Sequence, residues 1–199
     1  MSWSFFAYLS RLKLINRWSL MRNTQQENDA EHSLQVAMIA HALALIGRDR
    51  YGRETDPEHV LCLAVYHDAT EVMTGDLPTP VKYYSDDLRG AYHHLEDLSA
   101  RRLLNLLPED LRASYAPCLI QEAGYDRDIV KAADKISAYI KCLEEMRAGN
   151  HEFDYAAENI RRTLEAVPYP EVSVFMRDFL PSFQQTLDEL NHPQGGEKG

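Results

Sequence analysis

Residues 28–47 of the chain read NDAEHSLQVAMIAHALALIG, and this stretch is typical of a long buried helix. Asn28 is a residue type that caps helices, Glu31 follows it at the capping-box position, and Gly47 is the expected end of the helix. Apolar residues surround most of the segment, as in a helix inside a core; they are Leu34, Val36, Met38, Ile39, Leu43 and Ile46. The sequence therefore predicts a central core helix with His32 near its start.

Helix signals continue on the C-terminal side of this segment. Residues 56–73 read DPEHVLCLAVYHDATEVM, with Asp56 as the expected cap and Pro57 at the first helical position. Asp126 is the expected cap of a later helix that ends at Gly149. The further expected helices cover 86–106, 109–123, 127–148, 152–166 and 171–190. No strand pattern, repeat or long linker is visible. We therefore expect one all-α, helical-bundle domain of about seven or eight helices over residues 1–191, followed by a disordered tail, residues 192–199.

The bulk composition is that of a soluble globular protein with an acidic balance. The 199 residues are 45% hydrophobic and 26% charged, which suits one domain, or at most two small ones, with a sizeable core. The net charge of −10 argues against a nucleic-acid polymer as the partner, because polyanion binding uses clustered lysines and arginines. It still allows one small phosphorylated substrate, which a metal and one or two arginines can hold.

Several features bear on the cellular location. Three separated cysteines, Cys62, Cys118 and Cys142, do not form a disulfide framework and predict a cytoplasmic protein. No apolar run approaches the roughly 18–20 residues of a membrane span. Residues 1–18 lack the basic start and the cleavage site of a signal peptide. We expect them to form a helix docked on the core rather than an amphipathic helix on a membrane surface.

Residues of metal-ligand type fall on three of the predicted helices; they are His32, His67, Asp68 and Asp134. Each also has an ordinary interpretation, since a histidine at a helix start is usually solvated and Asp134 could pair with Lys131 or Lys135. Together they favour a metal, because unpaired carboxylates are costly in an apolar core and facing helices can converge their side chains on one ion. Two imidazoles and two carboxylates suit Mn, Co, Fe, Ni or Zn.

Glu71, Arg17 and Trp18 are weaker candidates on spacing alone. Glu71 lies three residues after Asp68, so a continuing helix would keep it on the same side as that carboxylate, where it suits a general acid or base. A solvated carboxylate at a helix end fits Glu71 about equally well. A surface arginine and a tryptophan at the edge of the core account for Arg17 and Trp18 better than a binding site does.

Five segments together resemble a known family. AEHSLQVAMIAHAL (30–43), YHDATEVMTGDLPTPVKYY (66–84) and KAADKISAYIKCLEE (131–145) resemble the HD-domain phosphohydrolases, and more narrowly the YfbR-type bacterial 5′-deoxynucleotidases. FFAYLSRLKLINRWSLMRN (5–23) and FLPSFQQTLDEL (179–190) are similar to the same family. The resemblance covers nearly the whole chain, although residues 85–130 match less distinctively.

The resemblance implies a role for each candidate. The four metal ligands would be His32, His67, Asp68 and Asp134, and two of them, Asp68 and Asp134, would also face the substrate. Glu71 and Arg17 would be catalytic: Glu71 would carry a proton, and Arg17 would hold and orient the 5′-phosphate through its donor fork. Trp18 would pack against the nucleoside.

The resemblance also assigns the loop after Gly75 to the nucleotide site. Its lining residues would be Asp76, Leu77, Pro78 and Thr79. Asp76 is suited to accept a hydrogen bond from the sugar 3′-hydroxyl, and Thr79 could donate or accept another. A preference for the deoxy sugar would be steric, with Trp18 as part of a tight wall where a 2′-hydroxyl would lie.

The leading hypothesis is therefore a metal-dependent phosphomonoesterase that hydrolyses deoxyribonucleoside 5′-monophosphates with a metal-activated water. Cobalt or manganese is favoured as the ion over Zn, Ni, Cu, Fe or Mg, and the resemblance implies a homodimer. One alternative keeps the HD-type site but changes the substrate to a triphosphate, cyclic or signalling nucleotide. Another is a helical module that binds nucleotide without turnover.

Overall fold

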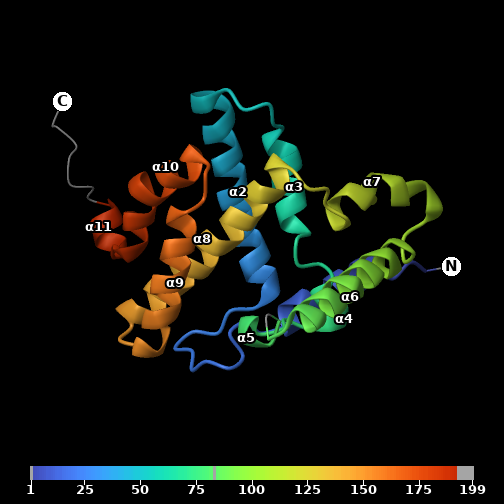
Figure 1. The fold of residues 1–199 in the computed structure, drawn as a ribbon, viewed down its shortest axis with the longest axis horizontal. Coiled ribbons are helices and arrows are strands. Elements are labelled where there is room, and N and C mark those ends of the chain that lie inside the picture. Colours follow the sequence, from blue (N-terminus) through green and yellow to red (C-terminus); the bar gives the residue numbers. More distant parts are fainter. Residues whose placement is uncertain (1, 83, 192–199) are drawn as a thin grey trace.

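The fold is all-helical, as the sequence predicts, although the described residues form more helices than the seven or eight expected, because several expected helices are broken into shorter ones. The computed structural model describes residues 2–82 and 84–191, and this part of the chain contains eleven α-helices, three 3₁₀ helices and no strand (Figure 1). The helices are α1 (Phe5–Leu9), α2 (Asp29–Tyr51), α3 (Pro57–Val65), α4 (Glu71–Thr74), α5 (Thr79–Lys82), α6 (Asp86–Leu104), α7 (Glu109–Leu119), α8 (Tyr125–Arg147), α9 (Asp154–Glu165), α10 (Pro170–Asp178) and α11 (Leu187–Asn191), with η1 (Leu12–Leu14), η2 (His151–Phe153) and η3 (Leu180–Gln184). The expected disordered tail, residues 192–199, lies outside the described residues.

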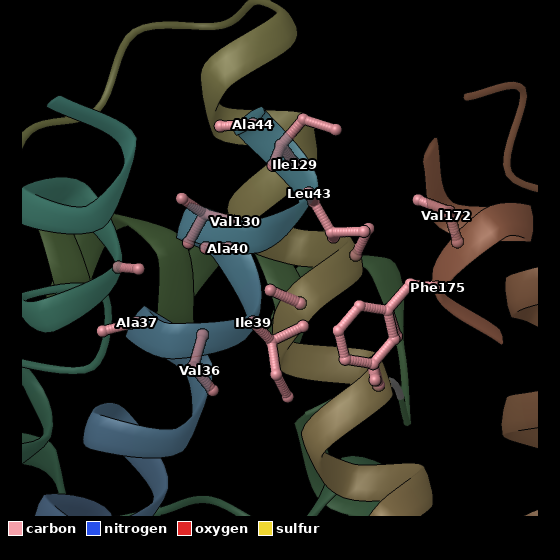
Figure 2. Packing of buried hydrophobic residues seen from close by; sticks show 14 of the residues in the cluster. Val36, Ala37, Ile39, Ala40, Leu43, Ala44, Ile129, Val130, Val172 and Phe175 are labelled. Atoms are coloured by element: carbon pink, nitrogen blue, oxygen red, sulfur yellow. The ribbon is translucent and has the colours of Figure 1, made fainter. Parts of the chain in front are cut away.

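The main core forms where α2 packs against α3 and α8, with α10 closing the far side (Figures 1 and 2). Ala37, Ala40 and Ala44 lie on α2, and their small side chains let neighbouring helices approach closely. Phe175 of α10 points into the same core, where Leu43 of α2 is also buried. Figure 2 shows these side chains between the helices. The expected central position of the 28–47 segment is confirmed.

Two apolar residues of this helix do not join the core. Leu34 is 62% exposed and Met38 is 59% exposed, so the expectation that both are buried is wrong. They lie four residues apart and therefore share one side of α2. The reason is that only part of the circumference of α2 is covered by α3, α8 and α10.

Gly47 does not end α2. The helix continues to Tyr51, and Gly52 caps it with a left-handed backbone, φ 65°. At Gly47 a Cβ atom would collide with the Tyr125 hydroxyl, which donates a hydrogen bond to the buried Glu171. The expectation that Gly47 ends the helix is therefore wrong, and close packing inside the helix explains the glycine.

Replacing Gly47 with alanine is expected to lower the free energy of unfolding by roughly 1–3 kcal/mol, as overpacking does. The matched control is Gly90→Ala in α6, where a new Cβ meets nothing within 4 Å. That change should stabilise the protein by about 0.5–1 kcal/mol, because alanine favours helix over glycine. Urea unfolding of both variants measures the difference; equal effects of the two substitutions would contradict the packing explanation.

Other helix boundaries follow the capping signals only in part. The caps at Asn28 and Asp56 are confirmed, and the Asn28 capping box with Glu31 is complete. Asp126 is not a cap: α8 begins one residue earlier, and the Asp126 carboxylate accepts a hydrogen bond from Thr55 Oγ1 at 2.7 Å. The expected 171–190 helix is broken into α10, η3 and α11, with Pro181 in the first turn of η3. A proline there removes a helical donor.

The expected 56–73 helix is also broken, and this break shapes the site. Helix α3 stops at Val65, residues 66–70 form turns, and α4 begins at Glu71. Ala69 holds the turn in a second apolar cluster with Phe5 of α1, with Leu103 near the end of α6 and with Leu107, which follows that helix. The expectation that the N-terminal segment docks on the core is thereby confirmed. Among the described helices, none combines the length and the hydropathy that a membrane span needs.

Candidate active site

The structure brings the four predicted metal ligands together at one end of the core. His32 lies in the first turns of α2, His67 and Asp68 in the turn after α3, and Asp134 in the middle of α8. His32 Nε2 lies 3.0 Å from Asp134 Oδ1 and 3.7 Å from Asp68 Oδ2. His32, His67 and Asp68 each offer one ligand atom, and these atoms lie within 4.8 Å of one another. This group could hold one cation.

Contacts behind the two histidines fix which ring nitrogen faces the group. His67 Nδ1 lies 2.8 Å from the Ala64 carbonyl oxygen, which can only accept, so Nδ1 carries the proton and Nε2 faces inward. His32 Nδ1 lies 3.1 Å from Ser137 Oγ, and the Ser137 hydroxyl donates to Gln35. Ser137 therefore accepts from His32 Nδ1–H, and Nε2 of His32 is again left for the site.

The electrostatics of the group favour two ionised carboxylates. Burial alone would raise the pKa of Asp68, but His67 and Arg17 outweigh it and hold that pKa far below its ordinary value. Burial would also raise the pKa of Asp134, and the hydrogen bond with His32 lowers it to about 2. Burial lowers the pKa of His67, but Asp68 outweighs it and raises the pKa to about 9. The site thus presents negative charge with a protonated imidazole beside it.

Arg17 lies among the same carboxylates. Its Nη1 donates to Asp68 Oδ2 at 3.1 Å, and its Nη2 lies 3.8 Å from Asp134 Oδ1. Its Nε lies 3.6 Å from Glu27 Oε2. Burial lowers the pKa of Arg17, yet Asp68 and Asp134 more than compensate, so the guanidinium stays charged. The residue predicted to hold a phosphate is therefore next to the predicted metal ligands.

Glu71 reaches the site although the helix before it is broken. One oxygen each of Asp29, Asp68 and Glu71 lies within 4.8 Å of the others, and Glu71 Oε2 is buried without a hydrogen-bond partner. Burial, together with the charges of Asp68 and Asp29, raises the pKa of Glu71 to about 11. This carboxyl therefore tends to keep its proton.

Asp29 is the site residue that the sequence did not single out. Its side chain is fully buried, neither oxygen has a hydrogen-bond partner, and Oδ1 lies 3.7 Å from Arg17 Nη1. Burial raises its pKa to about 6. An acidic residue in the first turn of a helix ordinarily complements the helix dipole at the surface, so the sequence held no signal that this one faces inward.

The predicted nucleoside residues lie on two segments near these carboxylates, the loop that carries Trp18 and the stretch from Asp76 to the start of α5. Trp18 has a left-handed backbone, φ 56°; its Nε1 donates to Glu27 Oε2 at 3.2 Å, and its ring packs on Phe153. Asp76 follows Gly75, which is left-handed with φ 72°, and burial raises the Asp76 pKa while Arg17 opposes the rise. Two further predicted residues, Leu77 and Pro78, are partly buried. The side chain of Thr79 lies outside what the structure describes.

Comparison with known proteins gives the family. Residues 4–183 match the family described as 5′-deoxynucleotidase YfbR-like. The chain is 50% identical over 189 residues to a 5′-deoxynucleotidase of Vibrio atlanticus, covering 94% of this chain and 97% of the relative. It is 51% identical over 190 residues to the 5′-deoxynucleotidase YfbR of Escherichia coli K12, covering 94% and 95% of the two chains.

Solved structures agree on the fold. An HD-domain phosphohydrolase from Listeria innocua superposes with a TM-score of 0.76 at 25% identity, covering 95% of this chain and 94% of that one. The HD phosphohydrolase DatZ of cyanophage S-2L, bound to dA and one catalytic Zn²⁺, superposes with a TM-score of 0.62, covering 90% and 96%. It is 20% identical and shows the fold alone. The family match over most of the chain and the half-identical relatives lead to one conclusion: the chain belongs to the YfbR-like family of 5′-deoxynucleotidases, within the HD-domain phosphohydrolases.

Proposed function

We propose that the chain hydrolyses deoxyribonucleoside 5′-monophosphates to deoxynucleosides and phosphate at the site formed by His32, His67, Asp68 and Asp134. The observation that carries this proposal is the convergence of two inward-facing imidazole Nε2 atoms and two ionised carboxylates, with Arg17 directly beside them. The family membership supports the reaction class and the substrate class.

The donor set fits a divalent ion. His67 Nε2 is buried, makes no well-directed hydrogen bond and lies 3.1 Å from Asp68 Oδ2, so one cation could contact both atoms. When bound, the ion would lower the pKa of a water ligand and polarise the phosphate. We propose cobalt or manganese, and Zn, Ni, Cu, Fe and Mg are the ions to compare, since mixed nitrogen and oxygen donors accept several of them.

Arg17 would bind the phosphate once a cation neutralises its present partners. Its guanidinium contacts Asp68 and Asp134, which are also the proposed ligands. A cation on these carboxylates would weaken their hold on Arg17, and its planar fork would then be free to pair with phosphate oxygens. Glu71 would move a proton, and its high pKa favours donation to the leaving 5′-oxygen.

The nucleoside would rest on the two segments that carry Trp18 and Asp76. We propose that Trp18 packs on sugar and base, that Asp76 accepts from the 3′-hydroxyl, and that Leu77, Pro78 and Thr79 line the remaining wall.

We also propose that the protein is cytoplasmic and forms a homodimer. Light scattering of the purified protein would test the dimer.

The deciding experiment is phosphate release from dAMP with added Co²⁺ or Mn²⁺, next to a metal-free control. Deoxy- and ribonucleoside mono-, di- and triphosphates and cyclic nucleotides complete the panel. We expect turnover of the deoxynucleoside monophosphates only with metal. Preferential turnover of a triphosphate or cyclic nucleotide would change the substrate assignment, and nucleotide binding without turnover of any member would contradict the proposed reaction.

Metal uptake is expected to release about one proton near neutral pH. In the metal-free protein the pKa of His67 is about 9, so the imidazole is protonated at pH 7.5 and must lose its proton to become a ligand. Apparent metal affinity should therefore rise about tenfold per pH unit up to about pH 9 and level off above it. Calorimetry in buffers of different ionisation enthalpy measures the proton count; a pH-independent affinity between pH 7 and 9 would contradict the assignment.

Trp18→Leu is expected to reduce the ratio of kcat/KM for dAMP over AMP by about tenfold, as a lost steric wall would. Trp3→Leu is the matched control, because Trp3 is 51% exposed and lies outside the loop that carries Trp18. Steady-state rates on both nucleotides give the ratio. If Trp18→Leu leaves it unchanged, Trp18 does not explain the deoxy preference.

A further inference from the structure

The loop between η1 and α2, residues 15–28, carries both Arg17 and Trp18. Its base is closed by backbone contacts: Asn16 and Asn28 form an antiparallel bridge, and Asp29 N donates to the Ile15 carbonyl at 3.1 Å. Arg17 N also donates to the Glu27 carbonyl at 3.0 Å. These bonds fix the ends of the loop and leave its tip, residues 19–25, to be held by something else.

A buried carboxylate on α8 holds the tip. Glu145 is 1% exposed, and it accepts hydrogen bonds from Thr24 N at 2.9 Å, Thr24 Oγ1 at 2.7 Å and Gln25 N at 3.2 Å. Asn150 Nδ2 adds a fourth at 2.9 Å. Lys141, also buried, pairs with Glu145 and donates to the Gln25 carbonyl oxygen. Burial raises the pKa of Glu145, but Lys141 and Thr24 outweigh it and keep the group ionised.

The loop needs such support because it is strained. Trp18 is the one described non-glycine residue with a positive φ, and a bulky side chain is unfavourable in that region of backbone conformation. Such a conformation persists only where the surroundings enforce it. Asn23 Nδ2 donates to the Trp18 carbonyl at 3.2 Å, so the neighbour of Thr24 is itself bonded to the strained residue.

One face of α8 carries both the residues that hold the loop tip and the residues that contact His32. Asp134, Ser137, Lys141 and Glu145 follow one another at intervals of three and four residues and therefore lie along the same side of the helix. The first two contact His32, and the last two contact the loop tip. The rigid helix thus sets the distance between a proposed metal ligand and the loop that carries Arg17.

We propose that Glu145, assisted by Lys141, is a positioning residue that holds Arg17 and Trp18 in place for the substrate. The proposal rests on the proposed function for the roles of those two residues. The hydrogen bonds of Glu145 and Lys141 go to the loop tip, to Asn150 and to each other, so their effect on the site would pass through the loop. A buried ion pair contributes little net stability, so the presence of this pair is better explained by its fixing one conformation of the loop.

The experiment changes, in separate variants, the acceptor and the donor of the hydrogen bond between Thr24 and Glu145. Glu145→Gln alters the acceptor, Thr24→Val removes the hydroxyl donor at similar volume, and Thr24→Ser keeps that donor. Glu165→Gln is the matched control, because Arg161–Glu165 on α9 is a pair with the same four-residue spacing but exposed to solvent. All variants are made in a Trp3→Phe background, which leaves Trp18 as the sole tryptophan.

We expect Glu145→Gln to raise KM for dAMP about tenfold and Thr24→Val a few-fold, since a loop displaced by a fraction of an ångström loses substrate contacts. Thr24→Ser and Glu165→Gln should stay near the parent. Acrylamide quenching of Trp18 should increase in the first two variants, and their metal affinity should remain within about twofold of the parent's, because the proposed ligands are untouched.

Unchanged KM and unchanged Trp18 quenching in Glu145→Gln, with only a lower melting temperature, would overturn the proposal and leave the pair a structural contact. If that variant does not fold, the Thr24→Val and Thr24→Ser pair decides by the same readouts. Failure of the parent to release phosphate would count against the proposed function alone. Quenching needs no turnover and would still show whether Glu145 holds Trp18.

Discussion

Replacing Asp68 or His67 with alanine is expected to lower kcat for dAMP by at least about a thousandfold, even with Co²⁺ or Mn²⁺ in excess. Asp68 contributes most, because its Oδ2 lies within 4 Å of His32, His67 and Arg17. Its removal therefore takes away a proposed ligand and a partner of the phosphate-binding arginine together. The double variant should be little worse than either single one, since residues that act as a unit are not additive.

The fold should survive both changes. His67 and Asp68 lie in the turn between α3 and α4, outside regular helix, and the neighbouring Ala69 supplies the buried anchor of that turn. Circular dichroism should remain strongly helical. The matched controls are His94→Ala and Asp97→Ala, which remove the same residue types from the exposed face of α6. Wild-type turnover by either site variant in metal-supplemented buffer would show that the site is assigned wrongly.

The parts of this site that the sequence could predict are those that lie in local patterns. His32 follows a capping box, and His67 and Asp68 end an apolar run, so both positions could be placed near helix ends in a core. Convergence with Asp134 was expected from the residue types on three predicted helices and was supported by the family resemblance, because no local pattern relates His32 and Asp134, 102 positions apart.

The errors have a common physical cause, which is that tertiary contacts decide what local patterns leave open. Glycine is a residue type that often ends a helix. At position 47, however, glycine is needed because the Tyr125 hydroxyl, which comes from a different helix, lies where a Cβ atom would be. Leu34 and Met38 are apolar but lie on the part of α2 that no described helix covers. Glu145 binds a loop 121 residues away, and no periodicity could indicate that contact.

Glu71 illustrates how a correct expectation can rest on a wrong element. A continuous helix was expected to keep it beside His67 and Asp68, yet the chain breaks into turns over residues 66–70. The turns fold back so that Glu71 still lies near Asp68, and they also bring it to Asp29 at the start of α2. The break thus adds a second carboxylate to the surroundings of Glu71, and this proximity raises its pKa.

Glu71→Gln is accordingly expected to lower kcat by about 10²–10⁴-fold, the usual contribution of a positioned proton carrier. Glutamine keeps the volume and a polar end but cannot transfer a proton, so KM and metal affinity should change little. Glu165→Gln on the exposed side of α9 is the matched control. Rates of both variants on dAMP, with metal affinity measured separately, distinguish lost proton transfer from lost metal.

The pH dependence of kcat distinguishes a Glu71 that donates a proton from one that accepts it. If Glu71 acts in its protonated form, the parent's kcat falls as pH rises through the pKa of Glu71, and that limb is absent in Glu71→Gln. Without a cation the pKa of Glu71 is about 11. A cation bound beside Asp68 would favour the ionised form of Glu71 and lower that pKa, so the fall in kcat would begin at a lower pH. Asp29→Asn should move it further toward neutral pH, because the charge of Asp29 helps to raise that pKa. A parent whose activity instead falls on the acid side, with that limb lost in Glu71→Gln, would make Glu71 the base; a Glu71→Gln variant within threefold of the parent would exclude both roles.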